Sequence, residues 1–351
     1  MKTTRRESGL KPKKAYWRPL LAAVAALALT LGAAACGEKS EKPVGAIKLS
    51  GFDLALDWFP NPDHLAIYEA IKEGYFRDVG LDVKPHVPSD PAAPIKQVAA
   101  GRVDLAISYE PEVFLARQQG LPVVAVAALV QRPLTSLIAI GRKRIHSAAD
   151  LRGKRVGTAG IPYQAAYLRT ILERAKVPPS SVKETSIGTS LLPAMLSGKV
   201  DATLAAFWNV EGVQLRQRHT NPTIIPVDRL GVPSYDELVL VANENELKKR
   251  RDDLRLFIGA VAHGARQARR DPGGTARALT DANRDLKVRS TRASVRVTLP
   301  ALFPSDDRPW GYMDPAQWRV YGAWMFGHQL LRQRPASGDA FTNELLPAVG
   351  L

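Results

Sequence analysis

One stretch of the chain, residues 54–83, constrains the fold most, because it has the pattern of a strand, a loop, a helix and a second strand in direct succession. Large apolar residues alternate with smaller or polar ones from Leu54 to Trp58, which is the period of a strand. Pro, Asn and Asp within 59–63 end that strand, because Pro lacks an amide donor and Asn and Asp favour turns. A helix then fits His64 to Glu73, and Gly74 can end it in the left-handed conformation.

The loop of this β-α-β unit is a candidate ligand site. The loop after the first strand lies at the carboxyl edge of the sheet, where open α/β sheets bind ligands. Three of its side chains are candidate ligand contacts: Trp58, Asn61 and His64. Structural alternatives stay open, since a Trp at a strand end often packs in the core and a His here can simply begin the helix.

The N-terminal segment has the layout of an export signal. Seven Lys or Arg residues precede an apolar run from Leu20 to Ala35. This run is shorter than the roughly 20 residues that a membrane span needs, and it suits the apolar part of a signal peptide. Small residues, Ala33 to Ala35, stand directly before Cys36, the single cysteine of the chain. We therefore predict a signal peptide over residues 1–35.

The junction before Cys36 resembles the lipobox of bacterial lipoproteins. The resemblance implies cleavage before Cys36 and acylation of its thiol, which would anchor the protein by lipid to the extracytoplasmic face of the cell membrane. An ordinary signal peptide with an incidental cysteine is the alternative. Residues 36–47 would then form a polar, flexible tether. With one cysteine, an intrachain disulfide is excluded.

The formal charge of +15 does not indicate a nucleic-acid partner. The first 35 residues carry a net +6 of this charge, which leaves about +9 for the processed chain. Basic residues are otherwise scattered, apart from short clusters at 142–144 and 248–251. We find no signature of a nucleic-acid-binding fold, so we interpret the charge as a solvated surface near anionic lipid headgroups.

A weak internal repeat suggests two similar α/β lobes. Residues 100–104 and 197–201 both read as a helix end, a Gly, a basic residue, Val and Asp, followed by a strand. Each strand leads into aromatic and acidic residues, which are Tyr109, Glu110 and Glu112 in one copy and Trp208 and Glu211 in the other. If the strand edges of the two lobes face each other, both sets line one cleft. The alternative is that helix-Gly-strand junctions are common in all α/β proteins.

Five segments match one family in order and spacing: DWFPNPDHLAIYEAIKEGYF, SYEPEVFLARQQG, GTAGIPYQAAYLRTIL, AFWNVEG and GVPSYDELVLVA. They resemble the substrate-binding proteins of ABC importers of the thiamine-pyrimidine type, the NMT1/THI5-like family, a group shared with eukaryotic pyrimidine-precursor synthases. The segments cover about residues 50–245. The C-terminal third matches only as generally helical, and we interpret its Trp residues as packing.

The resemblance implies a two-lobed α/β fold of the type II periplasmic-binding-protein kind, with mixed sheets flanked by helices and two hinge crossings. The first lobe would comprise residues 48–140 and 236–351, and the second lobe would be inserted between them as residues 141–235. The ligand would stabilise the closed arrangement, because contacts from both lobes exist only there.

The resemblance also implies a function. The chain would be an extracytoplasmic binding lipoprotein that captures a formylamino- or hydroxymethyl-aminopyrimidine and delivers it to an ABC permease in the membrane. Riboflavin, nitrate or a sulfonate are alternative ligands, because relatives carry other small molecules. A pyrimidine-precursor synthase is the enzymatic alternative, and His64 matches the helix-start His of the synthases. The Cys-rich motif of the synthases is absent from this chain, and so are a GxSxG motif and a P-loop.

We therefore predict a monomer that is not an enzyme and carries no cofactor or metal. None of the six His residues pairs with another at metal-ligand spacing.

The family resemblance assigns a flat heteroaromatic ligand to specific side chains. Rings that would stack on it are expected at Trp58, Tyr109, Tyr163 and Trp208. Glu211 would accept a hydrogen bond from the exocyclic amino group, and Asn61 would serve the ring nitrogen and amino group together. Alternatives remain, since Glu211 also suits the first turn of a helix, Tyr163 an ordinary strand-turn-helix junction, and Tyr235 packing near a hinge.

Overall fold

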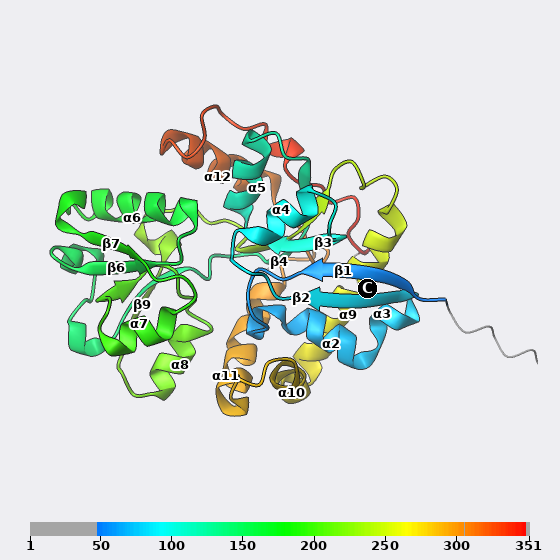
Figure 1. The fold of residues 1–351 in the computed structure, drawn as a ribbon, viewed down its shortest axis with the longest axis horizontal. Coiled ribbons are helices and arrows are strands. Elements are labelled where there is room, and N and C mark those ends of the chain that lie inside the picture. Colours follow the sequence, from blue (N-terminus) through cyan, green and yellow to red (C-terminus); the bar gives the residue numbers. More distant parts are fainter. Residues whose placement is uncertain (1–47, 305, 349–351) are drawn as a thin grey trace, which may run out of the picture. The chain divides into compact units, whose positions relative to one another are not determined.

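Two five-stranded mixed sheets form the framework of the computed structural model (Figure 1). The structure describes residues 48–304 and 306–348. The predicted signal peptide (1–35), Cys36 and the tether (36–47) lie outside the described residues. Within the described ranges, no helix combines the length and the apolar character needed to cross a membrane.

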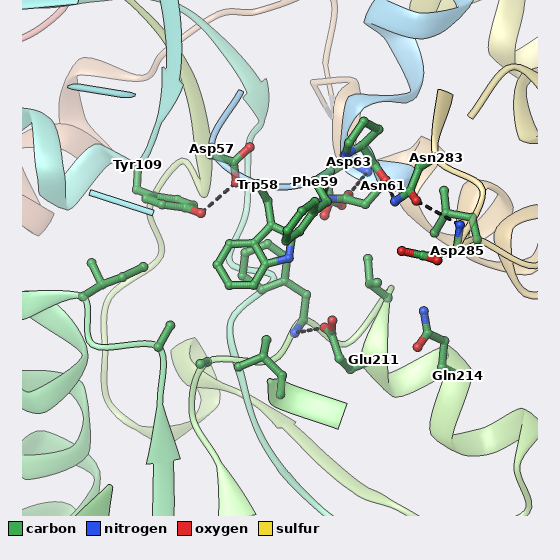
Figure 2. Close-up of a pocket in the computed structure, with 18 of the residues that line it drawn as sticks. Asp57, Trp58, Phe59, Asn61, Asp63, Tyr109, Glu211, Gln214, Asn283 and Asp285 are labelled. Atoms are coloured by element: carbon green, nitrogen blue, oxygen red, sulfur yellow. Dashed lines mark hydrogen bonds between the residues drawn. The ribbon is translucent and has the colours of Figure 1, made fainter. Parts of the chain in front are cut away.

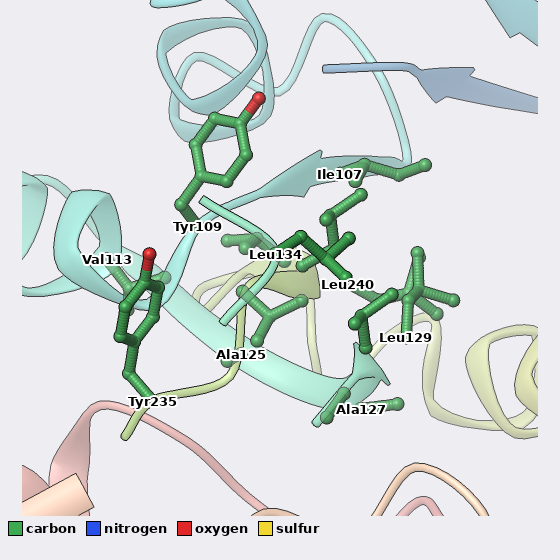
Figure 3. Close-up of a cluster of buried hydrophobic side chains, with 14 of the residues drawn as sticks. Ile107, Tyr109, Val113, Ala125, Ala127, Leu129, Leu134, Tyr235 and Leu240 are labelled. Carbon is green, nitrogen blue, oxygen red and sulfur yellow. The ribbon is translucent and has the colours of Figure 1, made fainter. Parts of the chain in front are cut away.

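The first sheet contains five strands: β1 (Ser50–Ala55), β2 (Leu81–His86), β3 (Leu105–Ser108), β4 (Val123–Val130) and β10 (Leu238–Asn243). Their order is β2-β1-β3-β10-β4, with β1 parallel to β2 and β3, and β10 antiparallel to β3 and β4. β4 is buried along its whole length, as its continuous apolar sequence predicts. Figure 3 shows part of the surrounding core, including Ile107, Leu129 and Leu240.

The second sheet also contains five strands: β5 (Ser136–Ala139), β6 (Arg155–Thr158), β7 (Lys183–Ser186), β8 (Ala202–Thr203) and β9 (Thr223–Pro226). Their order is β7-β6-β8-β5-β9, with β6 parallel to β7 and β8, and β5 antiparallel to β8 and β9. Sheet membership changes between β4 and β5, at residues 131–135. Pro133 interrupts the apolar sequence there.

Helices follow most strands of both sheets. Those after strands of the first sheet are α2 (Leu65–Glu73), preceded by η1 (Pro62–His64), then α3 (Tyr75–Asp78), α4 (Ala93–Ala99) and α5 (Glu110–Gln118). Those of the second are α6 (Pro162–Arg174), α7 (Leu191–Ser197) and α8 (Glu211–Gln217). Four more follow β10: α9 (Arg251–Arg270), α10 (Pro272–Ala282), α11 (Val288–Thr298) and α12 (Pro315–Gly327). Of these, α9 and α10 pack on α2, and α12 packs on α5 (Figure 1).

Close contact between α9 and α2 depends on Gly264. A Cβ added there would lie 2.9 Å from the Ala70 amide nitrogen, so we expect Gly264→Ala to lower the free energy of unfolding by about 1–3 kcal/mol. Gly259 in the same helix has open space at that position, so Gly259→Ala should be neutral or stabilise by up to about 1 kcal/mol. Urea denaturation measures both changes. Equal losses for the two variants would contradict the packing argument.

The internal repeat has a structural counterpart in two equivalent aspartates. Asp104 directly precedes β3, and its Oδ2 accepts from the Asp53 amide at 2.7 Å, while its own amide donates to Asp53 O at 2.9 Å. Asp201 directly precedes β8 and makes the same pair of bonds with Arg155, at 2.9 and 2.8 Å. In each sheet an Asp therefore fixes the register between two neighbouring parallel strands, which aligns the loops at their far ends.

The chain passes between the sheets twice, at residues 131–135 and 227–237, and Glu237 joins these two crossings. Glu237 is fully buried. Its Oε2 accepts from the amides of Leu134 and Thr135 at 2.6 and 2.8 Å and from the Tyr235 hydroxyl at 2.9 Å. Its Oε1 accepts from the Thr135 hydroxyl at 2.8 Å. Leu134 and Tyr235 also belong to the hydrophobic core (Figure 3), so polar and apolar contacts fix the crossings together.

The predicted β-α-β unit is present with shifted boundaries. β1 ends at Ala55, so Trp58 lies in the loop and not in the strand. Asp57, which precedes Trp58 in this loop, accepts side-chain hydrogen bonds from His64 and Tyr109, and these bonds hold it outside the strand ladder. β10 begins at Leu238, directly after the second crossing.

Candidate functional site

A cavity of about 240 Å³ lies between loops that follow strands of both sheets (Figure 2). The loop after β1 contributes one wall, together with Tyr109 at the start of α5. The second sheet contributes residues around the start of α6 and residues 205–214. The segment between α10 and α11 completes the wall with three residues: Asn283, Asp285 and Leu286.

A buried hydrogen-bond network holds the loop after β1. The Asn61 amide donates to His64 Nδ1 at 3.3 Å, so the proton of the imidazole resides on Nε2. His64 Nε2 then donates to Asp57 Oδ1 at 2.7 Å, and the Tyr109 hydroxyl donates to Asp57 Oδ2 at 2.7 Å. Both ring nitrogens of His64 and both carboxylate oxygens of Asp57 are therefore engaged. His64 is fully buried and braces the loop from behind the cavity wall.

The side chain of Asn61 also stabilises this loop. Its Oδ1 accepts from the Asp63 amide at 2.7 Å and caps η1, and its Nδ2 donates to Phe59 O at 3.1 Å. The same residue lines the cavity, beside Trp58 and Phe59. The phenyl ring of Phe59 is half exposed, although it is large and apolar, which is the exposure expected of a ring that contacts a ligand.

Two tyrosines meet edge to face at the inner end of the cavity. The rings of Tyr109 and Tyr163 lie 6.1 Å apart at 61°, so they bring together α5 beside the first sheet and α6 beside the second. Both rings are buried, and burial raises the pKa of each phenol well above its usual range. Both hydroxyls therefore stay neutral at any ordinary pH. Tyr163 packs further on Tyr167, which fixes its ring.

Glu211 and Gln214 place a carboxyl and an amide group one turn apart on α8. Glu211 Oε2 accepts from the Phe207 amide at 2.9 Å, which fixes the side chain at the cavity wall. Burial raises the pKa of this carboxyl above its ordinary value. Figure 2 shows the Gln214 side chain pointing toward Asp285, whereas the Glu211 carboxylate points toward its backbone hydrogen-bond donor. The site thus offers hydrogen-bond acceptors beside aromatic faces.

Asn209 connects η1 and α11 through two buried hydrogen bonds. Its Nδ2 donates to Asp63 Oδ1 at 2.5 Å and to Thr298 Oγ1 at 2.7 Å. Burial raises the pKa of the Asp63 carboxyl well above its usual range. Asp63 Oδ2 and Asn209 Oδ1 are both buried without a partner among the described residues. Asp63 is also one of the residues that line the cavity.

Five of the eight side chains predicted to contact the ligand line the cavity: Trp58, Asn61, Tyr109, Tyr163 and Glu211. Three lie outside its wall. His64 braces the loop, Trp208 donates its indole N–H to Pro133 O at 3.0 Å, and Tyr235 is buried at the second crossing. In the described part of the chain, no group of three or more His, Cys, Asp and Glu side chains is arranged to hold a metal ion.

Glu112, behind Tyr109, gives the protein a testable pH dependence. Burial raises the pKa of Glu112 to about 7, although Ser108 Oγ donates to its Oε2 at 2.6 Å. Because the pKa of Glu112 is higher in the folded state, the contribution of its protonated form to the free energy of unfolding is complete below the ordinary pKa of a Glu. That contribution is lost as pH rises through about 7. We expect the urea midpoint to fall between about pH 5 and 8, and Glu112→Gln to flatten this decline. An unchanged slope in the variant would refute the assignment.

Comparison with known sequences identifies the family. The sequence profile described as NMT1/THI5 like matches residues 61–275. The chain belongs to the NMT1/THI5-like family. This NMT1/THI5-like chain is 34% identical over 300 residues to the formylaminopyrimidine-binding protein of Halalkalibacterium halodurans, a match that covers 84% of this chain and 90% of that protein. It is 39% identical over 194 residues to the putative thiamine biosynthesis protein of Haemophilus influenzae, covering 55% of this chain and 62% of that protein.

A solved structure shares the fold of this NMT1/THI5-like protein. The alkanesulfonate-binding protein SsuA from Xanthomonas axonopodis pv. citri, bound to MOPS, superposes with a TM-score of 0.65 at 15% identity, covering 84% of this chain and 99% of that one. The predicted two-lobed binding-protein fold is thereby confirmed. Its 34% identity to a binding protein over most of both chains identifies it as a substrate-binding protein and not an enzyme.

Proposed function

We propose that this protein is the lipid-anchored, extracytoplasmic receptor of an ABC importer and that it captures a formylamino- or hydroxymethyl-aminopyrimidine. The observation that carries the proposal is the cavity, where the rings of Trp58, Tyr109 and Tyr163 lie near the Glu211 carboxyl. Aromatic faces suit a planar ring, and a carboxylate is a strong acceptor for an exocyclic amino group. The 34% identity to a formylaminopyrimidine-binding protein supports the same ligand.

Ligand capture proceeds by closure of two lobes, for which we propose the ranges 48–140 plus 236–351 and 141–235. Cavity residues come from segments of both, so the ligand is fully enclosed only when the lobes meet. The ligand then passes to a membrane permease. Anchoring through Cys36 rests on the sequence, where the single cysteine follows the apolar run.

Isothermal titration of the processed chain tests the ligand. We expect clear heat of binding with the formylamino- and hydroxymethyl-aminopyrimidines, and none with taurine or nitrate. Riboflavin serves as a second planar ligand. Heat with riboflavin, taurine or nitrate, together with none from either aminopyrimidine, would falsify the proposed ligand while leaving the receptor fold intact.

A further inference from the structure

The cavity wall differs in charge from the rest of the chain. The chain contains 49 Lys and Arg residues, yet none of them, and no His, lines the cavity in the described part of the protein. Four acids do: Asp57, Asp63, Glu211 and Asp285. A basic protein thus encloses its ligand in a wall that lacks cationic side chains, which is the opposite of what an anion site requires.

None of the four acids supplies the positive charge that an anion needs as a partner. Both carboxylate oxygens of Asp57 accept hydrogen bonds, from His64 and Tyr109, and Glu211 Oε2 accepts one from the Phe207 amide. Asp63 is among the residues that line the cavity, and its Oδ2 is buried with no partner among the described residues. This carboxyl adds no positive charge with which an anion could pair.

We propose that this cavity selects its ligand by charge, admitting a neutral or cationic heteroaromatic molecule rich in hydrogen-bond donors and rejecting the phosphate monoester of the same molecule. The inference rests on the proposed function for the identity of the ring. A phosphate monoester carries close to two negative charges at neutral pH. Moving that charge from water into a cavity whose wall has no cationic side chain leaves the charge unpaired, which is strongly unfavourable.

Paired titrations of the processed chain test the proposal. We expect hydroxymethyl-aminopyrimidine to bind at least about 100-fold more tightly than its phosphate monoester. Gln214→Arg introduces a guanidinium into the wall and should reduce this ratio by about tenfold or more, because Arg binds phosphate through paired hydrogen bonds. Gln217→Arg, an exposed position on the same helix, adds the same charge outside the cavity and should leave the ratio unchanged.

The outcomes separate this proposal from the ligand assignment. Equal affinity of the wild-type protein for the alcohol and its phosphate ester overturns charge selection but keeps the aminopyrimidine. An unchanged ratio in a folded Gln214→Arg variant also overturns it. If neither aminopyrimidine binds, the ligand assignment fails, and riboflavin against its phosphate monoester still decides whether the cavity discriminates by charge. A variant that fails to fold leaves the wild-type ratio as the deciding measurement.

Discussion

Replacing Glu237 by alanine is expected to lower the free energy of unfolding by about 3 kcal/mol or more. The carboxylate accepts three hydrogen bonds from the other crossing and a fourth from Tyr235 in its own, and all of its donors are buried. Each donor left without a partner costs about 1–3 kcal/mol, although partial relaxation lowers the sum. Glu237→Gln keeps one acceptor oxygen and the side-chain volume, so its loss should be smaller. Urea denaturation followed by circular dichroism measures both.

Glu244→Ala is the matched control for this experiment. Glu244 follows directly after β10, and its half-exposed carboxylate pairs with Arg117 at 3.0 Å. Pairs of this kind contribute about 0–1 kcal/mol. If Glu237→Ala is no more destabilising than Glu244→Ala, the two crossings are not held together by this carboxylate.

Substitution of Glu211 by glutamine is expected to weaken binding of the aminopyrimidine by about 10- to 30-fold. The substitution keeps the shape of the side chain but replaces a charged acceptor by a neutral one, a difference of about 1.5–2 kcal/mol. The loss should appear in the dissociation constant and leave the urea midpoint nearly unchanged. Isothermal titration with formylaminopyrimidine measures the first quantity, and denaturation the second.

Two controls define the specificity of this effect. Glu173→Gln changes an exposed acid on α6 and should alter neither quantity. Trp318→Phe removes an indole N–H that donates to Asp236 Oδ2 at 2.8 Å, so it should lower stability without changing affinity. Equal weakening of binding by Glu211→Gln and Trp318→Phe would show that Glu211 does not contact the ligand.

Much of the framework could be predicted from local sequence patterns, because strands and helices carry a periodicity that survives without tertiary information. The helix predicted from His64 to Glu73 is observed as α2 (Leu65–Glu73). Trp58 and Tyr109, which follow strand ends of one sheet, could also be placed near each other, because the carboxyl ends of neighbouring parallel strands share an edge.

Side-chain direction within loops could not be predicted, because periodicity stops where regular structure ends. Trp208 and Glu211 follow the same strand, yet the Trp208 indole bonds to the first crossing while Glu211 lines the cavity. Tyr235 is likewise directed into the core by its bond to Glu237. The sequence offers no signal that separates these cases.

The contribution of the C-terminal helices was missed for a different reason. The sequence indicates that this region is helical and apolar, which we interpreted as packing alone. Asn283 donates to Pro60 O at 2.9 Å across 223 residues of chain, and it brings Asp285 and Leu286 to the cavity. A contact of such long range leaves no trace in local patterns, and only the packing of α10 against α2 creates it.

The connection between α10 and α11 has an evolutionary consequence. The family profile ends at residue 275, whereas this connection reaches the cavity from beyond that point. It contributes no strand to either sheet, so its residues can be exchanged with little penalty to the scaffold. In evolution, substitutions in this short connection can therefore change the cavity wall without altering either sheet.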